Sequence, residues 1–246
     1  MSVPLIKTQG LGKTYPPANT ILQGLDLEIQ PGSYTVLMGR SGAGKSSLLN
    51  ILMGLEPLSA GQLWYESRPM QGLNEKQWAL YRRHNIGIVF QDHNLIPYLS
   101  LLENTVLAGL LNQRSQSEVR SRALSLFAEL SIEPLADRLP AEVSGGERQR
   151  AAIARALINE PSILFADEPT GNLNDEASQA VLQVFAQLHQ AGQSIILATH
   201  DVKSALEGTE VCFLRDGKNL TRWHKPAGSI EAQSALLYQW LHEQGW

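Results

Sequence analysis

The sequence has almost no cysteine, no long apolar run and no excess of positive charge. Cys212 is the one cysteine among 246 residues. This excludes an internal disulfide and most cysteine-based metal sites, and we expect a reducing compartment. No stretch of about 18 consecutive apolar residues occurs, and the opening residues lack the apolar core of an export signal. Lysine and arginine number 20 against 24 acidic residues, a net charge of -4, so we expect no nucleic-acid partner.

What is present is the composition of a folded globular protein, with 43% hydrophobic residues. Four short apolar runs divide the chain, at residues 35–38, 86–90, 163–166 and 195–199. None alternates with polar residues, which is typical of strands buried on both faces of a parallel sheet. The intervening segments space their apolar residues as amphipathic helices do. This alternation predicts a doubly wound α/β fold, in which ligands bind at the carboxyl ends of the strands.

A glycine-rich segment follows the first run and matches the pattern G-x-x-x-x-G-K-[ST]. It consists of Gly39, Arg40, Ser41, Gly42, Ala43, Gly44, Lys45 and Ser46. The glycines let backbone N–H groups turn toward phosphate oxygens at the start of the next helix. In such a P-loop the lysine reaches the β and γ phosphates and the serine hydroxyl binds Mg²⁺, so the pattern predicts a nucleoside triphosphate site. The alternative is a glycine-rich turn that only connects a strand to a helix.

Polar residues follow the other three runs. Gln91 follows the second, Asp167 and Glu168 the third, and His200 the fourth. A P-loop needs a carboxylate at the end of a neighbouring strand, so we expect Asp167 to hold the metal and Glu168 to act as the general base on the attacking water. Gln91 and His200 would lie beside the γ-phosphate. The alternatives are a helix-capping role for the two acids and ordinary strand-end positions for Gln91 and His200.

The segment S-G-G-E-R-Q-R at residues 144–150 allows two interpretations. Ser144 and Glu147 have the spacing of a capping box, which predicts the start of a helix. A cap does not explain Gly145 and Gly146, because glycine weakens the first turn. Glycines there would let an anion approach the helix N-terminus closely, so the functional interpretation is a phosphate contact.

Three further segments complete the expected organisation. Residues 92–143 show helical patterns without an obvious strand, with helix caps expected at Ser100 and Ser117. The opening, up to about residue 29, alternates as the strands of a small antiparallel edge sheet do. Residues 229–244 predict a terminal helix docked on the body of the protein. The apolar residues expected along one face of that helix are Ile230, Leu237, Trp240 and Leu241.

Together these motifs resemble those of the ATP-binding cassette (ABC) ATPases, in that family's order and rough spacing, over about residues 3–222. The resemblance implies a P-loop NTPase (RecA-like) core with a mostly parallel sheet, an N-terminal antiparallel β edge and an inserted α-helical subdomain. We expect residues 1–91 and 144–222 to form the ATP-binding core. Residues 92–143 would be the helical subdomain, and residues 223–246 a C-terminal helical tail.

The resemblance also implies roles for individual residues toward ATP and Mg²⁺. Metal ligation would fall to Ser46, Gln91 and Asp167, and hydrolysis to Glu168, Gln91 and His200. Tyr15 stands where the family places an aromatic that stacks on adenine; the alternative is a packing residue on an edge strand. Ser47 joins the P-loop residues, and Ser144, Gly145, Gly146 and Glu147 would contact the ATP held by a second copy. A homodimer around two ATP molecules is therefore expected.

The sequences VFQDHNLIPYLSLLEN, VSGGERQR and LFADEPTGNL resemble one branch of the family, which includes lipoprotein-release, macrolide-exporter, haem-exporter and FtsE cell-division systems. This implies ATP-driven export or extraction through a separate membrane subunit with few spans. That subunit would dock near the loop that starts at Asp92 and ends at Leu99, and a periplasmic adaptor is a further candidate partner. The chain would lie at the cytoplasmic face of the inner (plasma) membrane, held there by its membrane subunit.

Two other functions stay open. One is a mechanotransducer that uses the ATP cycle to regulate an extracytoplasmic partner without transport. The other is a soluble ABC ATPase of DNA repair or translation, although residues 92–143 lack the sustained heptads of a coiled-coil insertion.

The sequence departs from the family at Asn174, where an aspartate is usual. The lost charge would alter contact with the opposite protomer, but Asn174 can still cap the following helix.

Overall fold

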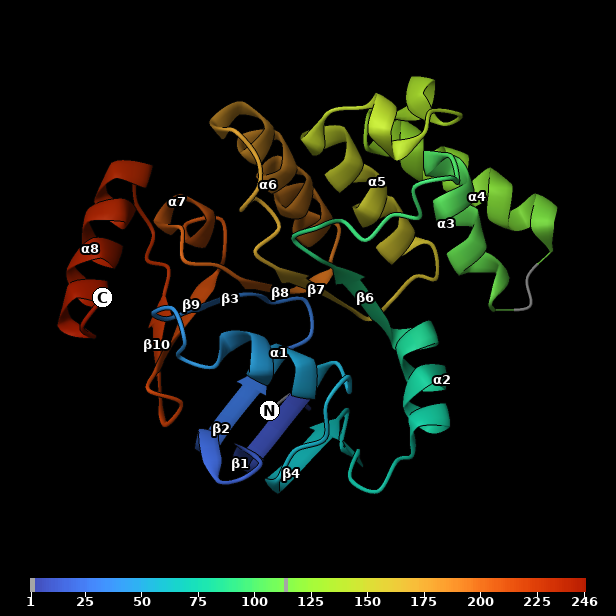
Figure 1. The fold of residues 1–246 in the computed structure, drawn as a ribbon. Coiled ribbons are helices and arrows are strands. Elements are labelled where there is room, and N and C mark those ends of the chain that lie inside the picture. Colours follow the sequence, from blue (N-terminus) through green and yellow to red (C-terminus); the bar gives the residue numbers. More distant parts are fainter. Residues whose placement is uncertain (1–2, 113–114) are drawn as a thin grey trace. The chain divides into compact units, whose positions relative to one another are not determined.

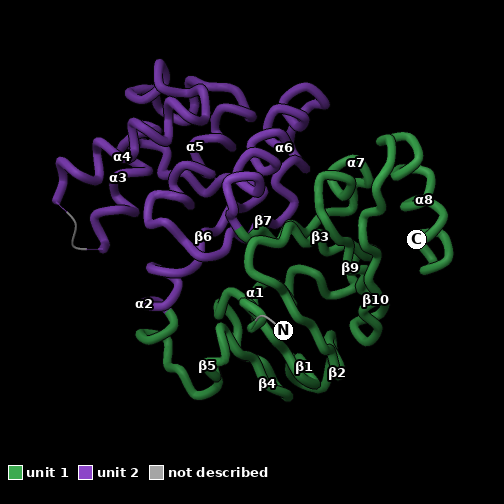
Figure 2. The backbone as a smooth tube through the Cα atoms, turned by 180° about the vertical axis from the view of Figure 1, so that it is seen from behind, with its two compact units in different colours: residues 1–78, 194–246 green, residues 79–193 purple. Residues whose placement is uncertain are grey.

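The computed structural model describes residues 3–112 and 115–246. The chain forms two compact units, residues 1–78 with 194–246 (unit 1) and residues 79–193 (unit 2) (Figure 2). Within the described residues, no helix has the length and apolar character needed to cross a membrane. Each unit is built around strands and helices that the sequence pattern explains in part.

Unit 1 contains an antiparallel sheet with the strand order β2-β1-β4-β5. Its strands are β1 (Ile6–Tyr15), β2 (Asn19–Ile29), β4 (Ala60–Tyr65) and β5 (Arg68–Pro69). β1 pairs with β2 from Ile6 opposite Ile29 to Tyr15 opposite Asn19, which confirms the predicted antiparallel sheet in the opening residues. The sequence analysis did not predict β4 and β5, because β4 buries only Leu63 and Tyr65 and so shows little alternation.

Unit 1 also contains strands in the order β10-β9-β3-β8. They are β3 (Tyr34–Met38), β8 (Ser194–Ala198), β9 (Glu210–Arg215) and β10 (Asn219–His224). β3 runs parallel to both β8 and β9, and every residue of β3 and β8 is buried, as their unbroken apolar runs predict. The hairpin from β9 to β10 was missed. It turns at Asp216 and Gly217, both with positive φ, and the Asp-Gly pair is the sequence signal for such a turn.

Three helices belong to unit 1, and a fourth begins there. The three are α1 (Lys45–Leu52), α7 (Val202–Ala205) and α8 (Ile230–Glu243). The fourth is α2 (Glu75–Asn85), whose residues up to Trp78 belong to unit 1. α8, the last helix in Figure 1, confirms the predicted terminal helix. It buries Leu237 and Leu241. Ile230 is 70% exposed, so its predicted burial is wrong. One turn before Leu237 the buried stripe holds Gln233, whose amide donates to the carbonyl of Pro226 at 2.8 Å, and the stripe does not extend back to Ile230.

Unit 2 pairs two parallel strands, β6 (Ile86–Val89) and β7 (Ile163–Asp167). Its main helices are α3 (Leu101–Leu110), α4 (Gln116–Glu129), α5 (Gly145–Leu157) and α6 (Asp175–Gln190). Short 3₁₀ turns, η1 (Glu133–Leu135) and η2 (Pro140–Glu142), lie between α4 and α5. Phe127, Phe165 and Phe185 are buried in this unit.

Helix caps in unit 2 agree with the predicted spacing in two places and differ in one. Ser100 caps α3 and Ser144 caps α5, each in a full capping box. α4 is capped by Ser115, so the cap predicted at Ser117 is wrong. A capping box needs a glutamate or glutamine three residues after the serine. Glu118 meets this requirement for Ser115 and accepts a hydrogen bond from its N–H, whereas the residue three positions after Ser117 is an arginine.

Candidate functional site

The P-loop of unit 1 leaves β3 at Gly39 and enters α1 at Gly44. Gly44 has φ 100° and is the N-cap of α1, a left-handed conformation that glycine adopts readily. A Cβ atom on Gly39 would lie 2.5 Å from the carbonyl oxygen of Leu214, and one on Gly44 would lie 2.6 Å from the side chain of Leu22. A larger residue at Gly39 would require the β9 backbone to shift, and one at Gly44 would have to displace the Leu22 side chain and adopt a left-handed conformation, so the glycines fix the shape of the loop.

The Lys45 side chain folds back over this loop. Its Nζ donates hydrogen bonds to the carbonyl oxygens of Gly39 at 2.7 Å and of Arg40 at 3.4 Å. The first turn of α1 contains no acidic residue, and no side chain caps it. The partial positive charge of the helix start and the ammonium group therefore act on the same small region, an arrangement that attracts phosphate.

Tyr15 and His200 are the other predicted site residues of unit 1. Tyr15, the last residue of β1, is half-buried, and its hydroxyl lies 3.4 Å from the Ser47 hydroxyl in α1. His200 lies two residues after the end of β8 and is exposed. Because β3 and β8 are parallel neighbours, with Leu37 opposite Ala198, the P-loop and His200 follow the same edge of the sheet.

Unit 2 brings Gln91, Asp167 and Glu168 to the carboxyl ends of one strand pair. β6 and β7 are parallel, with Val89 opposite Ala166, so these residues follow adjacent strands at one edge. Asp167 and Glu168 are half-buried. Glu168 has φ 47°, a left-handed conformation, and its carbonyl oxygen accepts a hydrogen bond from the N–H of Gly171 at 3.0 Å. This turn fixes the backbone of the predicted base.

The sequence analysis missed Asn172, which ties this edge together. The Gln91 amide nitrogen donates to Asn172 Oδ1 at 3.1 Å, and the Asn172 amide nitrogen donates to Asp92 Oδ1 at 3.1 Å. Gln91 uses its nitrogen in this contact. Its Oε1 oxygen is the atom that could serve as a metal ligand.

The segment at 144–147 is a capping box with an additional packing role for its glycines. Glu147 accepts hydrogen bonds from both the N–H and the hydroxyl of Ser144, at 2.7 Å each, and these contacts lower the pKa of the Glu147 carboxyl. A Cβ on Gly145 would lie 2.9 Å from the Leu173 side chain, and one on Gly146 would lie 3.0 Å from the Cβ of Ala177. Close packing against Ala177 therefore also favours a small residue at position 146, and at position 145 the end of the Leu173 side chain would have to move aside. The sequence analysis did not consider this reason.

The loop that starts at Asp92 and ends at Leu99 is held by residues outside it. Buried Asn104 accepts from the N–H of Ile96 at 2.7 Å and donates to its carbonyl at 3.1 Å. The Arg155 guanidinium donates to the carbonyl of His93 at 2.6 Å and to that of Asn94. Tyr98, at 80% exposed, extends from the loop. The backbone of this loop is thus fixed by hydrogen bonds, while the Tyr98 side chain is exposed.

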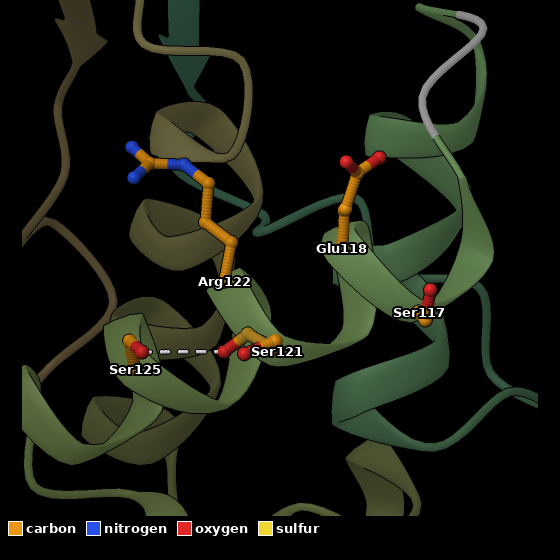
Figure 3. Close-up of a pocket in the computed structure, with 5 residues that line it drawn as sticks. All are labelled: Ser117, Glu118, Ser121, Arg122 and Ser125. Carbon is orange, nitrogen blue, oxygen red and sulfur yellow. Dashed lines mark hydrogen bonds between the residues drawn. The ribbon is translucent and has the colours of Figure 1, made fainter.

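Unit 2 contains two hollows near its helices. One, of about 540 Å³, is bounded by the end of α2, by β6 and by the facing parts of α3 and α5. The other, of about 570 Å³, runs along α4, where Figure 3 shows Ser121 and Ser125 on one helix face, and the Ser125 hydroxyl donates to the Ser121 carbonyl at 3.2 Å. This second hollow contains none of the predicted site residues. Across residues 3–112 and 115–246, no three His, Cys, Asp or Glu side chains form a metal-binding group by themselves.

A P-loop followed by a carboxylate-ended strand defines a nucleotide-binding protein, and the comparisons give the family. Residues 22–171 match the family model described as ABC transporter. The lipoprotein-releasing system ATP-binding protein LolD of Idiomarina loihiensis is 38% identical over 221 residues, which cover 88% of this chain and 97% of that protein. The macrolide export ATP-binding/permease protein MacB of Hahella chejuensis is 35% identical over 96% of this chain and 36% of its own length.

The fold has solved counterparts at similar identity. The dimeric structure of MJ0796, a bacterial ABC transporter cassette, has a TM-score of 0.83 and 34% identity, and the match covers 91% of this chain and 100% of that chain. A second dimeric structure of that cassette is a post-hydrolysis state with ADP and Pi bound. This chain belongs to the ABC transporter family. The predicted fold class, a P-loop NTPase of the ABC cassette type, is confirmed.

Asn174 provides a prediction about stability. Its side chain caps α6 by accepting from the N–H of Ala177 at 2.9 Å. Replacing Asn174 by alanine removes that acceptor and is expected to lower the free energy of unfolding by about 1 kcal/mol, measured by urea titration. Asn174→Asp, which keeps a capping oxygen, serves as the control and should stay within a few tenths of a kcal/mol. A similar loss in both variants would contradict a capping role.

Proposed function

We propose that this chain is the ATP-hydrolysing motor subunit of an ABC membrane system, which dimerises around two ATP molecules and drives export or extraction of a substrate through a separate membrane subunit with few spans. The observation that carries the proposal is the P-loop, in which the Lys45 ammonium group and a helix start without a side-chain cap lie at the same loop. The presence of Asp167 and Glu168 at the end of β7 adds the groups that hydrolysis requires.

The residues that the resemblance assigns to Mg²⁺ carry donors that suit this ion. Ser46 offers a hydroxyl, Gln91 an amide oxygen and Asp167 a carboxylate, and Mg²⁺ prefers such oxygen ligands together with phosphate oxygens and water. When bound, the metal would neutralise charge on the β and γ phosphates. Lys45 would exchange its hydrogen bonds to the loop carbonyls for bonds to those phosphates, which are stronger because both groups are charged.

Hydrolysis would fall to the residues that the family resemblance assigns to it. Glu168 would accept the proton of the attacking water, and its fixed backbone would reduce the reorganisation needed to reach that water. Gln91 and His200 would position the water and the γ-phosphate. Ser144 and Gly145 of a second copy would complete the site from the other side of the nucleotide, and the dimeric cassette of MJ0796 supports a dimer of this type. Dimer closure would then depend on bound ATP, and phosphate release would favour reopening.

The hollow between α2, α3 and α5 in unit 2 is the proposed contact for the membrane subunit. Asn94 from the expected docking loop lies in its wall. Its charged lining consists of Arg82, Arg83 and Arg155, and no acidic residue lines it. The Asn159 Oδ1 atom is buried at this wall and lacks a hydrogen-bond partner within the described part of the chain. The helices beside this hollow also expose leucines: Leu80 on α2, Leu107 on α3 and Leu111 at the C-cap of α3.

These features favour an occupant with apolar side chains, an acidic residue opposite the arginines and a backbone N–H available to Asn159. A segment of the membrane subunit with this chemistry would contact the hollow and the neighbouring loop at residues 92–99. Movement of that loop would reach Gln91, since Asp92 and Gln91 share the bridge through Asn172.

Reversing one charge in the hollow tests this contact. Arg83→Glu is expected to weaken association with the membrane subunit roughly 10-fold or more, because an acidic partner group would then face a like charge. The measurement is copurification from detergent extracts of the native host, together with the ATP affinity of the purified chain, which should not change. Arg120→Glu, on the exposed face of α4 outside the hollow, is the matched control. Equal copurification of the two variants would place the docking surface elsewhere.

The proposed function as a whole is tested by finding the partner. Tagged chain carrying Glu168→Gln, expressed in the native host and crosslinked in the presence of ATP, should copurify with a membrane protein of few spans and a large extracytoplasmic part. A many-span permease would instead contradict the assignment to this branch, and recovery with ribosomes or DNA would favour a soluble role. If the Glu168→Gln variant abolishes the activity of an extracytoplasmic enzyme, and no transported substrate is found, the mechanotransducer function would be favoured.

A further inference from the structure

A cluster of polar side chains around Glu56 joins β1 to the P-loop helix in unit 1. The Glu56 carboxylate accepts hydrogen bonds from the Tyr15 hydroxyl and, at 3.0 Å, from the Asn50 amide. The Lys13 ammonium lies 3.2 Å from the same carboxylate and also donates to the Pro57 carbonyl at 2.8 Å. Lys13 is buried, with 6% of its surface exposed. Burial of a lysine is uncommon unless it is paired, so the position of this charge is well defined.

The same cluster limits how the Tyr15 ring can move. Lys13 and Tyr15 are two positions apart at the end of β1, a spacing that places side chains on one face of a strand. The Lys13 Nζ lies 4.7 Å from the ring centroid, within the range of a cation–π contact. Glu56 holds the hydroxyl at the far end of the ring, and the Ser47 hydroxyl lies 3.4 Å from it. One ring face is therefore covered by a cation and the tip is fixed.

We infer that Lys13 and Glu56 are positioning residues for the nucleobase: they hold the Tyr15 ring ready for stacking and fix it relative to the phosphate-binding loop. The inference rests on the proposed function, in which Tyr15 stacks on adenine. Asn50 and Ser47 both belong to α1, the helix that begins with Lys45. The carboxylate thus connects the platform for the base with the element that holds the phosphates, and both ends of one nucleotide would bind to a preassembled surface.

The electrostatics of the cluster agree with this role. The hydrogen bond to Glu56 raises the pKa of the Tyr15 phenol, and the same bond lowers the pKa of the Glu56 carboxyl. Tyr15 therefore stays a hydrogen-bond donor and Glu56 stays charged across the neutral range. A side chain that is already ordered loses less conformational freedom when a ligand stacks on it, and this reduces the cost of binding.

The experiment compares a ligand that has a base with one that has none. Dissociation constants for ATP and for inorganic tripolyphosphate, both with Mg²⁺, are measured on the purified full chain by competition with a fluorescent nucleotide. Tyr15→Phe removes only the hydroxyl, and Glu56→Gln removes only the charge. Each is expected to raise the dissociation constant for ATP roughly 3- to 10-fold and to leave that for tripolyphosphate unchanged. The double variant should bind ATP only slightly more weakly than the weaker of the two single variants, because both substitutions act through the same Tyr15–Glu56 hydrogen bond.

A matched control exists in the same sheet. Glu28 forms an ion pair with Lys7 at 2.9 Å between β2 and β1, but both side chains are about half exposed. Glu28→Gln should leave both dissociation constants as in the wild type. An unchanged ATP affinity in Tyr15→Phe, or an equal loss for tripolyphosphate, would overturn the inference. The inference would also be overturned if the wild-type chain bound ATP no more tightly than tripolyphosphate. A wild-type chain that binds neither ligand would contradict the proposed function itself.

Discussion

Replacing Glu168 by glutamine is expected to lower the rate of ATP hydrolysis about 100- to 10,000-fold, because an amide cannot accept the proton of the attacking water. Glutamine has nearly the same shape, so the left-handed turn at residue 168 and its hydrogen bond from Gly171 should persist. ATP would still bind and would not be consumed. The purified variant should therefore accumulate as a dimer when ATP and Mg²⁺ are present, detected by size-exclusion chromatography, with turnover followed by phosphate release.

The control for this prediction is Glu129→Gln, which changes an exposed carboxylate at the end of α4 in the same unit. It should hydrolyse ATP at the wild-type rate and should not accumulate as a dimer. The assays are run on the purified chain and again with the proposed membrane subunit. Turnover of the Glu168 variant within a few-fold of wild type would show that another group acts as the base.

Replacing Lys45 by alanine is expected to have the second large effect, a loss of ATP affinity of about 10- to 100-fold. A hydrogen bond between charged groups contributes roughly 1.5–3 kcal/mol, and each 1.4 kcal/mol is a factor of ten in affinity. The loop itself should keep its shape, since Gly39 and Gly44 fix it through backbone conformation and close contacts with Leu214 and Leu22. Titration of the purified chain with ATP and Mg²⁺ by calorimetry measures the effect.

Lys218→Ala is the control, because Lys218 is exposed in the turn before β10 of the same unit. Its ATP affinity should equal that of wild type. The melting temperature of Lys45→Ala should also stay close to wild type, which separates loss of a phosphate contact from loss of the fold. Wild-type affinity in Lys45→Ala would remove this lysine from the phosphate site.

The buried parallel strands and the residues that follow them were predictable from the sequence because burial on both faces leaves unbroken apolar runs. The runs at residues 35–38 and 195–199 correspond to β3 and β8, and the caps at Ser100 and Ser144 were predicted from local spacing alone. These features depend on a few neighbouring residues, so a single sequence contains them. The missed strands β4 and β10 are short and largely exposed, and they exist because a partner strand is available to pair with them. β9 was missed as well, although it is buried from Glu210 to Leu214, pairs parallel with β3 and contains the apolar run at residues 211–214.

Contacts between distant segments were the part that could not be predicted. Asn172 forms hydrogen bonds with Gln91 and Asp92, which precede it by about eighty positions in the chain. No spacing rule connects residues that far apart. Glu56 lies in a loop after α1, and its meeting with Tyr15 requires the fold to be known. The Lys13–Tyr15 pair is an exception, since a spacing of two on a strand already places both side chains on one face.

The packing of Gly145 and Gly146 has a consequence for genetics. Any side chain at either position meets Leu173 or Ala177 at about 3 Å, whether or not a nucleotide is ever bound. In a saturation mutagenesis screen codon 146 would therefore score poorly even if phosphate contact were irrelevant, whereas the score of codon 145 would depend on how far the end of the Leu173 side chain can move aside. Intolerance alone would not reveal a role in catalysis. Compensating changes would distinguish the two causes: shortening Leu173 should rescue Gly145→Ala if the defect is one of packing, and suppressors selected at random should fall in codons 173–177.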